Sequence, residues 1–328
     1  MPSIGVYSIC NERFFLGLVA LVNSLRIHGV EAPVVVVDCG LSERQRELLA
    51  PQAAIVPAPP GVEPHLLKYV GPMQTPADSM LLVDADMIIT RPLDPIIDDV
   101  RAGKIVAFTD PLGDRFFESW RELLDLPELR RQPYANAGFL GLPRDPGLEL
   151  LERLERDQAL IETDETIWTG GSSERPTYFA DQDLLNALFA SVVPESGVSI
   201  LAQELAPHPP FDGVHVADLA AATCEYDDGT APFLLHHMLK QKPWLMPRRP
   251  TPYSELLPRL WLGEDVAVRL SEADVPLRFR GGPVAAAERR RAAATAFLQE
   301  SRGRLGLRRY LRDRRRARRR ATLEAGGS

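Results

Sequence analysis

The sequence predicts an α/β fold with a mainly parallel sheet that helices cover on both faces. Two observations support this. Short apolar runs recur through the first half of the chain, as in VVVV at 34–37 and MLLV at 80–83, and segments with helical spacing of apolar residues lie between them. Buried strands that alternate with helices are typical of parallel sheets. The 328 residues are enough for one large domain or two small ones.

The first half of the chain supplies these elements in a regular order. A strand is expected at 3–9, and a helix at 13–28, where apolar side chains recur at helical spacing and Gly29 offers a stop. Ser42 and Gln45 resemble a capping box that opens the next helix. Further strands are expected at 34–37, 55–56, 80–83 and 105–108.

The second half is less regular. We expect a strand at 138–142, helices at 148–160 and 181–190, and a last central strand at 233–237. The segment WTGGSSE at 168–174 is a loop by composition. We predict a catalytic domain at 1–250 and a C-terminal extension at 251–328, which ends in a basic tail that is at least partly helical.

The net charge of −7 conceals an asymmetry. Residues 302–320 contain eleven arginines and one aspartate, so the remainder of the chain carries a charge of −17. An acidic body argues against extended contact with nucleic acid, although the tail alone could bind anions. Leu307 and Leu311 share a helix face with Tyr310 beside them, a pattern that fits a helix on an anionic membrane surface. A disordered, solvated tail is the alternative.

Three features bear on the compartment. The chain has no run of 18 apolar residues, so we expect no transmembrane helix, and its N-terminus lacks the pattern of a signal peptide. Cys10, Cys39 and Cys224 are widely spaced and match neither a disulfide framework nor a zinc site. These features predict a cytoplasmic protein, peripheral at the inner face of the membrane if the tail binds there.

Two carboxylates interrupt the apolar stretch MLLVDADMII at 80–89. On an extended backbone Asp84 and Asp86 would point to the same side, at the edge of the sheet where open α/β folds bind ligands. Like charges this close repel each other unless a cation neutralises them, and divalent metals accept carboxylate ligands. The alternative is a strand exit with two solvated acids.

Three further motifs follow in the chain. They are NAGF at 136–139, DQDLLN at 181–186 and HHMLKQKPW at 236–244. Each has a local explanation: a turn at Asn136, a helix N-cap at Asp181, a core histidine at His236 and a surface turn at Lys242. Their occurrence together and in this order makes independent local roles a weaker explanation.

In this order the motifs resemble glycosyltransferase family 8, the retaining enzymes of GT-A fold that include glycogenin and bacterial lipopolysaccharide galactosyl- and glucosyltransferases. The resemblance covers about residues 3–245. It implies a GT-A fold and transfer of a hexose from a UDP-sugar, with UDP-glucose or UDP-galactose favoured. It also implies Mn²⁺, or Mg²⁺, as the cofactor. The acceptor is an unidentified sugar, glycolipid or protein.

The resemblance assigns Asp84, Asp86 and His236 as metal ligands. His236 is preferred to His237 because it lies six residues before Lys242, as in the family motif H-x-x-G-x-x-K-P-W. Leu239 stands where that motif has glycine, a departure at the position where the backbone approaches the phosphates.

The resemblance also implies contacts with the donor. The residues expected to make them are Asp84 and Lys242 at the diphosphate, Lys68 at the phosphate or the sugar, Asn136 and Gly138 at the sugar, Asp181 and Gln182 near the anomeric carbon, and Ile9, Cys10 and Asn11 at the uracil and ribose. Retention requires either a covalent intermediate on a carboxylate, for which Asp181 is placed, or attack on the same face. Gln182 is a poor nucleophile and could only stabilise a transient cation. The sequence does not choose between these routes.

Two other functions remain as alternatives. A sugar-1-phosphate nucleotidyltransferase would share the nucleotide-binding core and the metal, but such enzymes usually have a glycine-rich basic loop after the first strand. ICNERFF at 9–15 contains no glycine. The third candidate is a non-catalytic protein that binds anions or nucleic acid through its tail.

Overall fold

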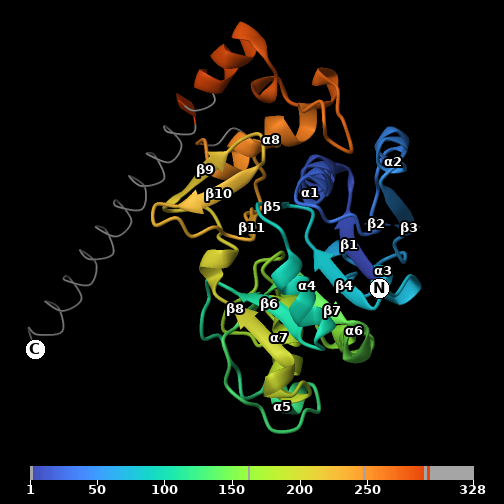
Figure 1. The fold of residues 1–328 in the computed structure, drawn as a ribbon. Coiled ribbons are helices and arrows are strands. Elements are labelled where there is room, and N and C mark those ends of the chain that lie inside the picture. The colour runs from blue at the N-terminus through green and yellow to red at the C-terminus, as the bar shows by residue number, and fades with distance from the viewer. Residues whose placement is uncertain (1–2, 162, 247–248, 292–293, 296–328) are drawn as a thin grey trace, which may run out of the picture.

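The computed structural model describes residues 3–161, 163–246, 249–291 and 294–295 (Figure 1). Its centre is a seven-stranded sheet in the order β3–β2–β1–β4–β7–β6–β8. The strands are β1 (Ile4–Cys10), β2 (Val34–Asp38), β3 (Ala53–Pro57), β4 (Ser79–Val83), β6 (Ile105–Thr109), β7 (Ala135–Pro143) and β8 (Val198–Leu201). Only β7 runs antiparallel to its neighbours in this sheet. The predicted, mainly parallel α/β architecture is therefore confirmed.

Helices pack on both faces of this sheet (Figure 1). One hydrophobic core contains buried side chains of α1 (Phe15–Ile27), α4 (Asp94–Arg101) and α8 (Pro252–Leu262). The other contains those of α6 (Arg144–Asp157) and α7 (Asp181–Ser191). The shorter helices are α2 (Glu43–Leu49), α3 (Val70–Gln74) and α5 (Trp120–Leu123). The capping box of Ser42 and Gln45 is present at the start of α2, as predicted.

Two small sheets lie outside the central one. β9 (Val214–Asp218) pairs with β10 (Thr223–Tyr226), and β5 (Met87–Ile89) pairs antiparallel with β11 (Leu234–His236). The expectation of a last central strand at 233–237 is therefore wrong. The chain turns after β4, leaves the central sheet as β5, and β11 pairs with that outlying strand instead.

The segment after residue 250 packs against the first helix. Tyr253 and Trp261 of α8 are fully buried in the same core as α1, and the indole Nε1 of Trp261 donates to the carbonyl oxygen of Leu16 at 2.7 Å. The division at residue 250 stays a prediction. The arginine-rich segment 302–320 lies outside the described residues. Within the described part of the chain, no helix combines the length and apolar character that a membrane span requires.

Candidate active site

A turn at the end of β4 presents the two predicted metal-ligand aspartates. The sequence predicts an extended backbone at Asp84 and Asp86, but the chain forms a turn there. The amide of Met87 donates to the carbonyl oxygen of Asp84 at 3.1 Å. The turn still brings the side chains together. Asp84, Asp86 and His236 each offer one ligand atom, and these atoms all lie within 4.8 Å of one another. Pairing of β5 with β11 positions the histidine, because His236 lies opposite Met87 in the register.

Asp86 is buried among cationic and polar groups. The ammonium Nζ of Lys242 lies 2.5 Å from its Oδ2, and Nε2 of His236 lies 3.4 Å from its Oδ1. Burial raises the pKa of Asp86, but the charges of Lys242 and His236 outweigh it and hold that pKa below its usual range. Oδ1 has no hydrogen-bond partner among the described residues. A buried carboxylate with one unused oxygen is suited to a cation.

Lys68 links Asp84 to the start of α7. Its Nζ donates to Oδ1 of Asp84 at 3.0 Å and lies 3.5 Å from Oδ2 of Asp181. Burial lowers the pKa of Lys68, yet the two carboxylates outweigh this and raise it above its usual value. Burial also raises the pKa of Asp181 to about 6, with Lys68 opposing this and Asp84 adding to it.

The backbone before Asp181 is unusual. Ala180 has a φ of 50°, in the left-handed region that non-glycine residues seldom adopt. Ala180 occupies the N-cap position of α7, and Asp181 is the first helical residue. The N-cap alternative for Asp181 is therefore wrong, and its side chain instead faces Lys68.

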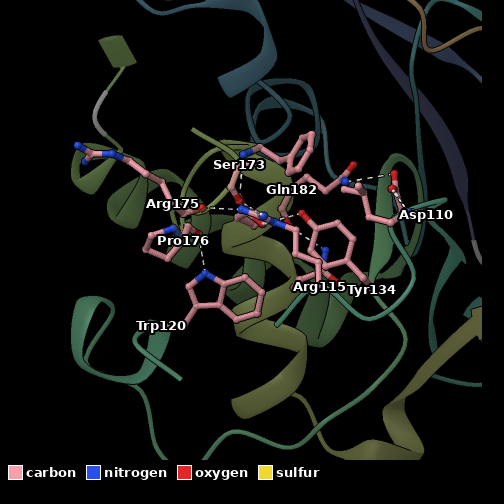
Figure 2. A network of polar contacts seen from close by, with 12 residues as sticks. Asp110, Arg115, Trp120, Tyr134, Ser173, Arg175, Pro176 and Gln182 are labelled. Atoms are coloured by element: carbon pink, nitrogen blue, oxygen red, sulfur yellow. Dashed lines mark hydrogen bonds and ion pairs between the residues drawn. The ribbon is translucent and has the colours of Figure 1, made fainter. Parts of the chain in front are cut away.

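Asn136 and Gln182 meet at Asp110, which the sequence analysis did not single out. Oδ2 of Asp110 accepts from Nδ2 of Asn136 at 2.7 Å and from Nε2 of Gln182 at 3.2 Å (Figure 2). Oε1 of Gln182 accepts from the amide of Ala137 at 3.0 Å. Both ends of the Gln182 amide are thus engaged with the protein. The available signal for Asp110 was its place directly after the strand at 105–109.

Gly138 is required by close packing. A Cβ atom at this position would lie 2.6 Å from Cε1 of His236 and 2.7 Å from the methyl carbon of Met87. The amide of Asp84 also donates to the carbonyl oxygen of Gly138 at 2.8 Å. The NAG motif therefore packs directly against two of the predicted metal ligands.

The third residue of the DQD motif has a different environment. Asp183 accepts two hydrogen bonds from Arg115, at 2.7 and 2.9 Å, one from the hydroxyl of Tyr134 at 2.7 Å and one from the amide of Phe179 at 2.8 Å. Arg115 also donates to the carbonyl oxygens of Ser173 and Arg175 (Figure 2). We call this group the Arg115 cluster. Sequence reasoning missed it.

The three residues predicted to contact the nucleotide, Ile9, Cys10 and Asn11, have different surroundings in the structure. Ile9 lines a small cavity together with Lys68, Asp84 and Gly138. The cavity measures about 10 Å³, so it has room for about one water molecule. Asn11 uses its Oδ1 to accept from the amide of Phe14 at 3.2 Å, which caps a short 3₁₀ helix. The neighbouring Cys10 is buried, and burial raises the pKa of its thiol.

A second histidine contacts the predicted metal ligand His236. Nε2 of His208 lies 3.2 Å from Nδ1 of His236, and both side chains are buried. Burial lowers the pKa of His208 to about 3, and His236 acts in the same direction, so the ring is neutral near pH 7. Sequence reasoning missed this residue because His208 lies in no recognisable motif.

The comparisons with known proteins agree with this architecture. No protein-family model and no curated protein sequence matches the chain. The structure is similar to that of the galactosyltransferase LgtC in complex with donor and acceptor sugar analogs, with 17% identity, 80% of this chain and 98% of that chain covered, and a TM-score of 0.51. It is also similar to the bifunctional glycosyltransferase WbbM in its apo form, with 14% identity and a TM-score of 0.51. That match covers 81% of this chain and 50% of the WbbM chain.

This chain has the GT-A fold. In this GT-A chain the candidate site lies where β4 ends. Gly138 of β7 and His236 at the end of β11 lie beside the turn that follows β4, and Lys68 links this turn to Asp181 at the start of α7. The structure thus brings Lys68, Asp84, Asp86 and Asp181 near one another, with His236 and Lys242 completing the group. The roles assigned to these residues stay predictions.

Proposed function

We propose that this chain is a metal-dependent retaining glycosyltransferase. It would transfer a hexose from a UDP-sugar, with UDP-glucose or UDP-galactose favoured, to a glycan or glycolipid acceptor. The main support is the convergence of Asp84, Asp86 and His236, with candidate ligand atoms within 4.8 Å of one another. Further support comes from the GT-A fold and from its similarity to LgtC, which was solved with donor and acceptor sugar analogs.

The donor atoms suit the proposed cofactor. Two carboxylates and one imidazole favour Mn²⁺ over Ca²⁺, because imidazole is unusual around hard cations. The unpartnered Oδ1 of Asp86 also fits a cation at this position. When bound, the ion would act as a Lewis acid on the diphosphate leaving group. Mg²⁺ is the alternative ion.

Two lysines would act on the same leaving group. Lys242 is buried and the side chain of Lys68 is 9% exposed, and each pairs with a carboxylate, Asp86 and Asp84 respectively. Both ammonium groups lie where the negative charge of a departing diphosphate would need stabilisation, and fixed charges in a buried site are effective at this. Lys68 also contacts Asp181 and would orient that carboxylate toward the sugar.

Asp181 is the carboxylate best placed to act at the anomeric carbon. Its Oδ2 is buried and has no hydrogen-bond partner among the described residues, although Lys68 lies 3.5 Å away. Gln182 is held by Asp110 and Ala137. We infer that Asp181 supports the retaining step, either by covalent attack or by stabilising a transient cation.

A donor screen tests this function. UDP-glucose, UDP-galactose, UDP-N-acetylglucosamine and GDP-mannose are incubated with the full-length protein, with Mn²⁺ and with EDTA, and release of the nucleoside diphosphate is measured. We expect release from a UDP-hexose with Mn²⁺ and none with EDTA. Equal release in EDTA would contradict the metal role. Formation of a UDP-sugar from UTP and a sugar 1-phosphate would identify a nucleotidyltransferase instead.

A further inference from the structure

A second pocket lies on the other side of the segment that contains Lys68. It has a volume of about 760 Å³, and we call it the acidic pocket. Its lining comes from three segments of the chain, at 61–69, 155–159 and 164–169. Leu67 and Lys68 line the small cavity beside Asp84, whereas the adjacent Leu66 and Tyr69 line the acidic pocket. One short segment therefore separates the candidate active site from a much larger pocket.

An exposed tryptophan forms part of this lining. Trp168 is 50% exposed, whereas the other three tryptophans of the chain are at most 5% exposed. Its ring centroid lies 5.7 Å from that of His65, which also lines the pocket. Burial lowers the pKa of His65 to about 4, and nearby Lys68 acts in the same direction, so this ring is neutral near pH 7. The pocket thus presents an uncharged aromatic surface.

Carboxylates and an unused amide complete the pocket. Glu63, Glu155 and Asp164 line it, and no lysine or arginine is found among its described lining residues. Gln158 also lines it and is only 9% exposed, yet its Nε2 has no hydrogen-bond partner among the described residues. A buried amide is seldom left unpaired in a folded protein, because the desolvation of the amide is then not compensated. Gln158 therefore holds an unpaired donor beneath the wall of the pocket, which would become available to a ligand if the side chain rotated toward the cavity.

We propose that the acidic pocket binds a neutral sugar unit of the acceptor, an inference that rests on the glycosyltransferase function proposed above. A pyranose ring has an apolar C–H face that can pack on Trp168 and hydroxyl groups that can pair with Gln158 and the carboxylates. The volume suits an oligosaccharide unit, since ligand pockets commonly measure about 300–1,000 Å³. Three carboxylates without a basic partner in the lining disfavour sialylated, uronic or phosphorylated sugars by like-charge repulsion.

The location agrees with this assignment. Trp168 lies in the segment that leads to Asp181, and the amide of Ile167 donates to the carbonyl oxygen of Tyr178 at 2.8 Å. The segment thus folds back toward the start of α7. A sugar in the acidic pocket would lie on the opposite side of the Lys68 segment from the metal-ligand aspartates. Because the reacting hydroxyl must reach the anomeric carbon beside Asp181, the unit held in the acidic pocket would be one that is distant from that hydroxyl in an oligosaccharide acceptor.

Sugar binding to the full-length protein tests the proposal directly, without donor or turnover. The neutral probes are lactose, maltose and N,N′-diacetylchitobiose, and the anionic probes are 6′-sialyllactose and digalacturonate, all followed by saturation-transfer NMR. We expect saturable binding of at least one neutral disaccharide and a change in tryptophan emission, because Trp168 is the only exposed indole among the described residues. Trp168→Ala should weaken this binding at least about tenfold, and Gln158→Met about three- to tenfold.

Ile167→Ala is the matched control, because Ile167 is adjacent and 42% exposed but does not line the pocket. It should bind the probes as the wild type does, and thermal melting of all three variants checks that they are folded. The proposal is overturned if no neutral probe binds, if Trp168→Ala binds equally well, or if the anionic probes bind as tightly. Failure of the donor screen with intact sugar binding would instead reject the glycosyltransferase function.

Discussion

Two aspartates in the first turn of α7, Asp181 and Asp183, lie in regions that differ in how fully their carboxylate oxygens are hydrogen-bonded. Asp183 lies in the Arg115 cluster, where both of its oxygens accept hydrogen bonds and its side chain is fully buried. Asp181 lies in the candidate active site, where its Oδ2 has no hydrogen-bond partner among the described residues. Two positions in sequence separate a fully paired carboxylate from one that is not.

The difference indicates what each region is for. A buried charge with all its partners in the same chain stabilises the fold and has no lone pair left for a ligand. The Arg115 cluster also joins the segments at 115, 134 and 173–179, so it holds the loops that precede α7. Asp181 and Asp86 each retain an oxygen without a hydrogen bond, and both face the cationic groups that a diphosphate or a metal would meet.

The Arg115 cluster should show the largest effect on stability. Arg115→Ala leaves Asp183 buried with its main partner removed, and breaking a buried pair in this way costs about 3–5 kcal/mol. Denaturant unfolding measures the loss in the free energy of unfolding. Arg131→Ala is the control, because Arg131 is 74% exposed in the ion pair with Glu118 and should change stability by less than about 1 kcal/mol. Equal effects of both variants would contradict the structural role.

Asp86 should differ from Arg115 in having a large effect on turnover. Asp86→Asn removes one charged ligand from the proposed metal site, so donor hydrolysis with Mn²⁺ should fall by about 100- to 1,000-fold. The variant keeps a side chain of nearly the same shape, but it leaves the buried ammonium of Lys242 without a charged partner, so the free energy of unfolding should also fall. Circular dichroism and denaturant unfolding check that the variant is folded under the assay conditions. Asp98→Asn, on the exposed side of α4 with a 72% exposed side chain, is the control and should retain activity. Full activity of Asp86→Asn would remove Asp86 from the metal site.

Much of this architecture was predictable from the sequence. Six of the seven strands of the central sheet and the helices α1 and α7 were expected from local patterns, because apolar period and turn residues act over a few positions. The edge strand β8 was not expected. The meeting of Asp84, Asp86 and His236 was expected too, but for a wrong reason. The two aspartates converge because a turn, and not an extended strand, brings them together. His236 lies on β11, which pairs with β5 rather than with the central sheet.

The groups that sequence reasoning missed all depend on long-range contacts. Asp110, Arg115 and His208 lie 72, 68 and 28 positions from Gln182, Asp183 and His236, the residues they contact. None of the three belongs to a motif, and an isolated aspartate, arginine or histidine is most often a surface residue. Only the packing of the loops around α7 and β11 reveals them as partners of the motif residues.

His208 lies next to the candidate active site and contacts one of its predicted metal ligands, His236, without being a predicted ligand itself. If Nε2 of His236 faces the metal, as its position beside Asp86 suggests, then its Nδ1 carries the proton and donates to His208. Such outer partners fix the tautomer of a ligand, and their loss typically weakens metal binding by about 10- to 100-fold. His208→Ala should therefore weaken Mn²⁺ binding in the presence of UDP, measured by electron paramagnetic resonance. His215→Ala, at a 48% exposed side chain, is the control. Unchanged affinity in His208→Ala would show that the contact only packs the two rings.

The pKa of Asp181 tests whether its carboxylate is incompletely paired, because a pKa depends directly on the burial and the charges around the group. Burial raises this pKa to about 6 in the protein without metal, whereas Lys68 lowers it and Asp84 raises it. A carboxyl resonance that titrates near pH 6 and disappears in Asp181→Asn should therefore be visible by carbon-13 NMR, and at pH 5 about a tenth of the molecules would carry the ionised form.

The same shift has a defined effect on stability. The fold favours protonated Asp181, so its contribution to stability is present below pH 4 and is lost as the pH rises through 6. Other carboxylates titrate in this range, so the informative quantity is the difference in melting temperature between the wild type and Asp181→Asn, which should grow in favour of the variant from pH 4 to pH 7. Titration near pH 4 together with a constant difference in melting temperature would mean that Lys68 compensates the burial of Asp181 completely, and the contrast between the two regions would fail.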